Sequence, residues 1–254
     1  MQASALAGVS VVGSLARSHT VKPGQAFEGI ILLRNAGDEP TEVRVSQTDY
    51  LFFADGRNLY DEPGTVPRSN ARWITISPSR LTVPPKQTAS VYFKGTVPDK
   101  AELKGSYWSM VMVEPVVTPS PAVKGETNKV TVGLQTLIRY AVQIVTEIGD
   151  TGTRDIKFLD KKVVVAEGKR TLRLDIENTG ERMLSPTVWA ELHNEQGVSI
   201  GKFEGSRQRI YPGCSVRQQI DLTAVPPGKF TALVVVDNGD DQVMGAQYQL
   251  EIEK

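Results

Sequence analysis

Residues 129–145 read KVTVGLQTLIRYAVQIV, and apolar side chains recur along them at every second position. The members of this row are Val130, Val132, Leu134, Ile138, Tyr140, Val142 and Ile144, and Thr136 is its one interruption. A period of two is that of a β-strand, whose successive side chains point to opposite faces. The row therefore predicts a strand over 129–145 with one nearly continuous apolar face.

Such a face needs a cover, and the sequence leaves two covers open. The strand could be the last one of an ordinary sandwich domain, with its apolar face in the domain's own core. Alternatively, part of the face could be lent to another protein that pairs along the strand. Only the three-dimensional structure can decide between these interpretations.

The composition places the chain in the all-β class. Short runs of β-branched and aromatic residues alternate with Pro and Gly, and long amphipathic helical patterns are absent. The 254 residues carry 29 basic and 29 acidic side chains, so the net charge gives no signal for nucleic acid or for an acidic membrane surface. No apolar run approaches the length of a membrane span. Cys214 is the only cysteine and cannot form an internal disulfide.

Two similar halves follow one another along the chain. The segments FEGIILLRNAGDEP (27–40) and EGKRTLRLDIENTGERMLSP (167–186) are each an alternating strand ended by Asn-x-Gly, a chain-reversal signal. Each half later shows a proline-marked turn followed by apolar strands. About seven strands per half predict two tandem immunoglobulin-like β-sandwich domains. Gly, Asp and Thr cluster in EIGDTGTRD at 147–155, which predicts domains at 1–148 and 149–254.

The order of several segments resembles that of a known family. GSYWSMVMVEP (105–115), a proline-rich loop, and then Leu134, Gln135, Thr136, Ile138 and Arg139 are similar to the end of the first domain in periplasmic pilus-assembly chaperones. The resemblance implies two sandwiches in an L or boomerang arrangement and a non-enzymatic chaperone or assembly factor without a cofactor. It also implies a pilin-like subunit as partner and a periplasmic or otherwise extracytoplasmic location. An outer-membrane usher is a further candidate partner.

The same resemblance implies a partner-binding site. In such chaperones the last strand of the first domain pairs with a subunit that lacks one strand, and two basic residues hold the subunit's terminal carboxylate. Arg139 falls on one basic position, and His19, or Arg17 two residues before it, falls on the other. The residues expected to contact the partner are Val130, Val132, Leu134, Thr136, Ile138, Arg139, Arg17 and His19. The alternative for Arg139 is a solvated or interdomain ion pair.

The first residues, MQASALAGVSVVGS, lack the basic leader and long apolar segment of a complete secretory signal. We expect that a signal sequence preceded them and was removed.

Other functions have weaker support. No H-E-x-x-H, paired C-x-x-C or G-x-S-x-G motif is present, which argues against an enzyme. The acidic run DNGDD at 237–241 lacks the ligand spacing of the helical calcium loop, so we expect a turn and no metal. A structural or adhesive envelope protein built of tandem immunoglobulin-like modules remains the alternative function. The long polar stretch 55–73 is a candidate second recognition surface without an assignable ligand.

Overall fold

The computed structural model describes residues 8–116 and 137–253, and within them the regular structure is β-strand except for one short 3₁₀ helix, Ala71–Trp73. The chain forms two compact units. The first takes residues up to 49, 61–102 and 107–146, and the second takes 50–60, 103–106 and 147–254. The limits 1–148 and 149–254, and an L arrangement, stay predictions. In the described part of the chain, no helix combines the length and hydropathy needed to cross a membrane.

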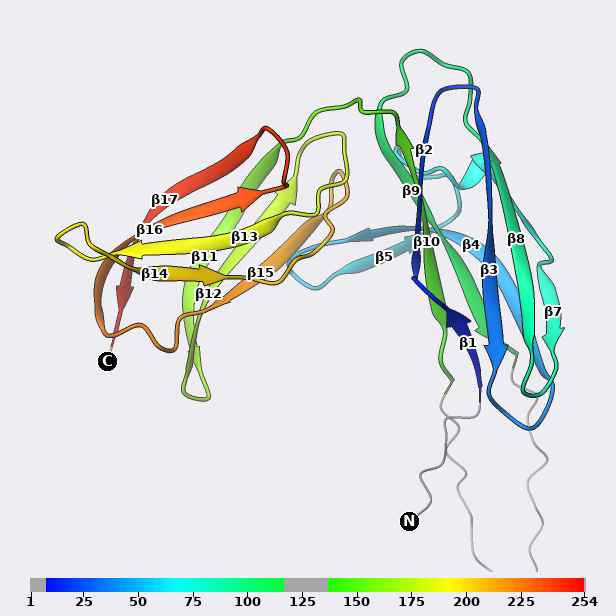
Figure 1. The fold of residues 1–254 in the computed structure, drawn as a ribbon, viewed down its shortest axis with the longest axis horizontal. Coiled ribbons are helices and arrows are strands. Elements are labelled where there is room, and N and C mark those ends of the chain that lie inside the picture. Colours follow the sequence, from blue (N-terminus) through cyan, green and yellow to red (C-terminus); the bar gives the residue numbers. More distant parts are fainter. Residues whose placement is uncertain (1–7, 117–136, 254) are drawn as a thin grey trace, which may run out of the picture. The chain divides into compact units, whose positions relative to one another are not determined.

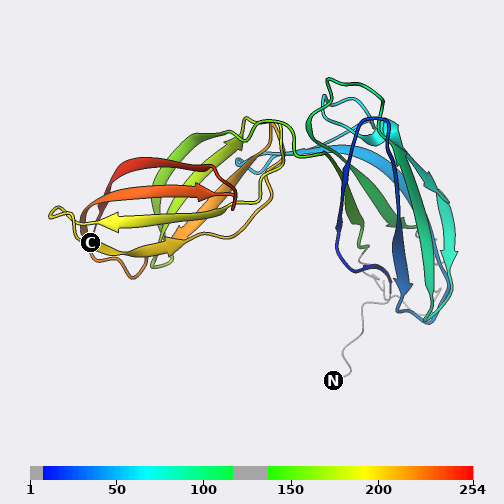
Figure 2. The same ribbon diagram turned by 45° about the horizontal axis from the view of Figure 1, so that its top comes forward.

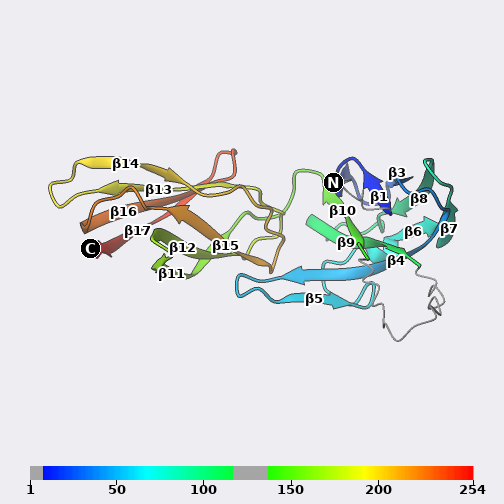
Figure 3. The ribbon, with the colours of Figure 1, turned by 90° about the horizontal axis from the view of Figure 1, so that it is seen from below.

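The first sandwich consists of two sheets (Figure 1). One has the order β1-β3-β8-β6, and these strands are Val9–Val12, Ala26–Asn35, Thr88–Thr96 and Ile74–Ser77. The other has the order β2-β10-β9-β4-β5, with strands Ala16–Val21, Tyr140–Ile148, Gly105–Pro115, Thr41–Phe52 and Asn58–Asp61. β7, Arg80–Val83, also pairs with β4. Figure 3 shows β5 alongside β4 at the end of this sheet.

The second sandwich has a three-stranded and a four-stranded sheet. The first has the order β11-β12-β15, with strands Ile156–Ala166, Lys169–Asn178 and Ser215–Asp221. The second has the order β14-β13-β16-β17, with strands Ser199–Glu204, Thr187–His193, Gly228–Asp237 and Val243–Ile252. These two sandwiches are the all-β immunoglobulin-like architecture that the sequence predicts.

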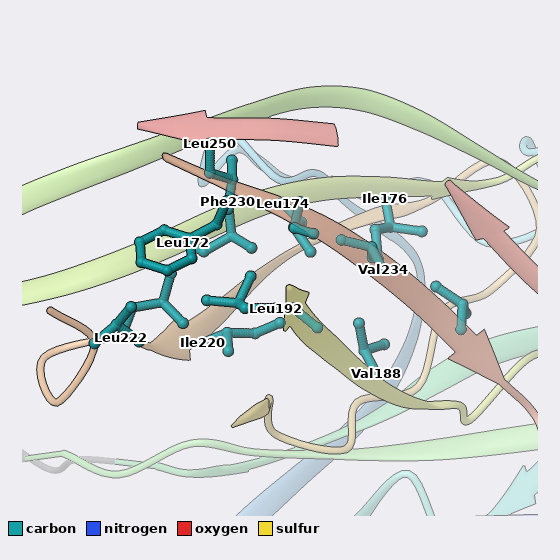
Figure 4. Close-up of a cluster of buried hydrophobic side chains, with 14 of the residues drawn as sticks. Leu172, Leu174, Ile176, Val188, Leu192, Ile220, Leu222, Phe230, Val234 and Leu250 are labelled. Carbon is teal, nitrogen blue, oxygen red and sulfur yellow. The ribbon is translucent and has the colours of Figure 1, made fainter. Parts of the chain in front are cut away.

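The core of the second sandwich follows from strand alternation. Leu172, Leu174 and Ile176 occupy every second position of β12 and are fully buried. They face Val188, Leu192 and Val234 from the other sheet, as Figure 4 shows. Burying each such side chain stabilises the fold by about 1.5–3 kcal/mol.

The two Asn-x-Gly turns use the same hydrogen bonds, which shows the likeness of the halves in atomic terms. Asn35 donates through Nδ2 to the carbonyls of Glu39 and Val83 and accepts from the Gly37 amide. Asn178 donates to the carbonyls of Arg182 and Ile210 and accepts from the Gly180 amide. Both asparagines are fully buried. The chain therefore reverses through Asn side-chain bonds, and neither glycine adopts a positive φ.

Candidate partner-binding site

The strand predicted over 129–145 has different limits in the structure. β10 begins at Tyr140 and ends at Ile148, three residues beyond the predicted end, while 137–139 precede it without strand structure. Four residues expected to contact a partner lie outside the described residues, and their role stays a prediction. They are Val130, Val132, Leu134 and Thr136.

Burial divides the described part of the apolar row. Val142 and Ile144 are fully buried, so these two side chains belong to the first sandwich's own core, as the first interpretation predicts. Tyr140 is half-buried, and Ile138 keeps 40% of its surface exposed, as does Leu137 with 41%. Exposed apolar side chains that a partner could contact therefore lie just before the strand and not farther along it.

A neighbouring strand covers one part of β10 and not the other. β10 lies between β9 and β2, and Figure 1 shows β2 and β10 running in the same direction. The Gln143 amide donates to the carbonyl of Leu15, the residue just before β2, at 2.8 Å. β2 therefore runs beside β10 from Gln143 onward. Among the described residues, no strand is paired along that side of 137–142.

Arg139 is held by a carboxylate at the end of the neighbouring strand. Its Nε lies 3.3 Å from Oε1 of Glu114, while Nη2 of Arg44 lies 2.7 Å from Oε2 of the same carboxylate. Arg80 stands nearby and pairs with Glu42 at 2.9 Å. Arg139 thus makes a partly solvated ion pair within the first unit, and its contact with a partner stays a prediction.

These side chains surround a hollow of about 200 Å³. Its lining comprises Arg44, Arg80, Glu114, Pro115, Val116, Leu137 and Arg139. Arg44 and Arg139 share the carboxylate of Glu114, and Arg80 is paired with Glu42, so three guanidinium groups meet two carboxylates. The remaining positive charge favours an added anion. Sequence reasoning missed Arg44, Arg80 and Glu114, because only the pairing of β4 with β9 and β7 brings them beside Arg139.

His19 and Arg17 make other contacts. The His19 ring packs against Phe27 and Phe93, with centroids 4.9 and 5.6 Å away, and its Nε2 is buried without a hydrogen-bond partner. Burial lowers the pKa of His19, which disfavours a cationic anchor. Arg17 instead donates to the carbonyls of Val12 and Ser14. These contacts share no atom with those of Arg139, and the predicted anchoring pair stays a prediction.

The long stretch 55–73 is attached to the sandwich by buried polar side chains. The fully buried Asp49 accepts hydrogen bonds from the amides of Thr65 and Val66 and from the hydroxyl of Ser69. Asn70 is also fully buried and donates to the carbonyl of Ile144 at 3.0 Å. These bonds fix the conformation of this stretch next to β10, which is a structural role.

The acidic run at 237–241 is a turn between β16 and β17. Gly239 donates to the carboxylate of Asp237, and Asn238 donates to that of Asp240. In the part of the chain that the structure describes, no three His, Cys, Asp or Glu side chains gather as a metal site would require.

Solved structures share this fold. A chain of a chaperone–tip adhesin complex of CFA/I fimbriae biogenesis matches with a TM-score of 0.51 and 13% identity, over 96% of this chain and 98% of that chain. The class 5 fimbriae chaperone CfaA matches with a TM-score of 0.50 and 12% identity, over 97% of this chain and 100% of that chain. The sequence matches no protein-family model and no curated protein sequence. At these identities the likeness is one of fold: two tandem immunoglobulin-like sandwiches, as found in fimbrial chaperones.

Proposed function

We propose that this chain is a non-enzymatic chaperone or assembly factor of the bacterial envelope that binds a pilin-like subunit by strand addition. The observation that carries the proposal is the side of residues 137–142 along which none of the described strands is paired, next to the exposed Leu137 and Ile138. A subunit strand added there forms backbone hydrogen bonds with this segment. Pockets of the subunit then receive alternate side chains of the segment. The likeness to fimbrial chaperones supports the fold that this mechanism needs.

The hollow beside Arg139 supplies a second element of the proposal. A carboxylate of the subunit enters it and bonds to the guanidinium of Arg139, with Arg44 and Arg80 adding positive charge. This version of the anchor does not need His19 or Arg17. The chain binds such a subunit in the periplasm. An outer-membrane usher is the candidate acceptor of the resulting complex.

The first test replaces Ile138 with Asp. A strand-deficient pilin-like subunit is co-expressed with the chain and recovered through a tag on the chain. We expect Ile138→Asp to lower recovery about tenfold or more, because a carboxylate in a dry apolar pocket costs several kcal/mol. Ile138 is exposed in the chain alone, so the variant keeps its thermal unfolding midpoint.

The matched control is Ile30→Asp. Ile30 lies on β3 and is 51% exposed, so the same change is made at a similarly exposed isoleucine away from 137–142. It should leave recovery unchanged. Equal recovery with both variants would contradict strand addition at this place.

Arg139→Ala tests the carboxylate site. The fold should be unaffected, since an exposed ion pair contributes little to stability, while subunit recovery should fall. Arg34→Ala, an exposed arginine on β3, is the control. Recovery with Arg139→Ala equal to that of the control would remove Arg139 from the mechanism and leave strand addition standing.

One observation favours the alternative of an adhesive envelope protein. A hollow of about 730 Å³ lies over β3, β8 and β6 and is lined by Ile30, Trp73, Tyr92 and hydroxyl-bearing side chains. Aromatic faces beside hydroxyl groups suit a surface polysaccharide. Retention of the chain on such a polymer, together with no recovery of any pilin-like subunit, would favour this function.

A further inference from the structure

β17 differs from the other strands that end the sheets. The four sheet orders end in eight strands in the described part of the chain: β1, β6, β2, β5, β11, β15, β14 and β17. β7, with four residues, pairs with β4 alone in the described sheets and is a ninth edge. β1, β5 and β6 have four residues each, β2 and β14 have six, and β15 has seven. Short or charged edges resist pairing with other chains. β17 has 10 residues, and among these edge strands only β11, with 11, is longer.

The other long edge is protected, and β17 is not. β11 carries Lys157, Asp160, Lys161 and Lys162, and its pairing is irregular between Phe158 and Asp160. β17 reads VMGAQYQLEI and has no charged residue before Glu251. Its register with β16 is regular from Val243 to Ile252. A long, regular edge whose only charge lies at its second-last residue is a template for strand pairing.

On its outer side, β17 is paired with none of the described strands. β16 is its only partner in the described sheets, and Figure 2 shows β17 in red on the outside of β16 in orange. β11 of the other sheet meets β17 through side chains, with Lys161 Nζ 3.6 Å and the Phe158 ring centroid 6.1 Å from the centre of the Tyr248 ring. In the described sheets these contacts add no strand to the outer side of β17, so its outward backbone groups can bond to an added strand.

The side chains of β17 suit a second copy of the same strand. In an antiparallel pair about a two-fold axis at Gln247, facing residues share one face of the sheet. Met244 then faces Leu250 and Ala246 faces Tyr248 on the inner face. On the outer face Gln247 faces its own copy, so two amides meet. No like charges oppose each other in this register.

We propose that two copies of this chain associate through β17, forming one continuous sheet of twice four strands with Gln247 on the two-fold axis. The partner is thus an identical strand, and the surface is distinct from 137–142. The arrangement does not depend on the proposed chaperone function.

Sedimentation of the whole chain over a range of concentrations tests this proposal. The unaltered chain should show a monomer–dimer equilibrium. Gln247→Lys places two ammonium groups opposite each other and should weaken dimerisation about tenfold or more. Gln219→Lys, at an exposed glutamine on the charged edge β15, should not change it. Both variants should keep the thermal midpoint that the unaltered chain shows at concentrations where it is monomeric.

A second variant tests the register. Gln247→Cys should give a disulfide-linked dimer on mild oxidation, while the unaltered chain, whose Cys214 is buried, should not. A chain that stays monomeric at its highest attainable concentration would overturn the proposal. So would a dimer that Gln247→Lys leaves intact.

Discussion

At the scale of single residues, the buried asparagines contribute most clearly to the fold. Asn178 satisfies the buried carbonyl of Ile210, the buried amide of Gly180 and the part-buried carbonyl of Arg182. Asn178→Ala should lower the free energy of unfolding by about 2–3 kcal/mol, because these groups lose their partner inside the protein. Urea unfolding measures this directly.

Asn194 provides the comparison for that variant. The side-chain oxygen of Asn194 accepts hydrogen bonds from the amides of Gln196 and Val198. Unlike those of Asn178, these bonds lie in an exposed turn. Asn194→Ala should cost less than about 1 kcal/mol, since water replaces the lost partner. Equal losses in the free energy of unfolding for Asn178→Ala and Asn194→Ala would show that burial does not cause the larger cost expected at Asn178.

His19 predicts a pH dependence of stability. Its pKa is lowered in the folded state by burial, so the unfolded chain binds more protons as the pH falls. The free energy of unfolding should therefore decrease as the pH drops below about 6.5, the ordinary histidine pKa, and continue to fall down to the folded-state pKa. His19→Phe should flatten this part of the profile. If the free energy of unfolding of the variant falls between pH 8 and pH 5.5 as steeply as that of the unaltered chain, a group other than His19 causes the pH dependence.

At the scale of strands, alternation in the sequence predicts which side chains enter a core. Leu172, Leu174 and Ile176 are buried as their period predicts, and so are Val142 and Ile144. Alternation does not reveal which strand lies next to another. The sequence therefore could not show that β2 covers β10 only from Gln143 onward, or that Glu114 meets Arg139.

The same limit explains the misplaced strand ends. Residues 145–148 are buried on successive positions, so the strand continues where the alternating pattern stops. A strand with neighbours on both sides and cover on both faces loses the period of two. His19 is a related case, because a polar residue type gave no sign that its ring would pack between Phe27 and Phe93.

At the scale of the whole molecule, the two sandwiches are versions of one plan. Each contains a buried asparagine after an alternating strand, with equivalent hydrogen bonds. They differ in their exposed segments: the first exposes Leu137 and Ile138 just before β10, and the second has β17, whose single charged residue is Glu251 near its end. This difference is the reason we propose subunit binding at the first unit and self-association at the second.

Amide hydrogen exchange with and without a strand-deficient pilin-like subunit tests the central proposal most directly. Amides of residues 138–142 that do not bond to β9 should exchange about tenfold or more slowly in the complex, because an added strand accepts their hydrogen bonds. Amides beyond Gln143, already beside β2, should change little. Unchanged exchange at 138–142 in a complex that forms would contradict strand addition at β10.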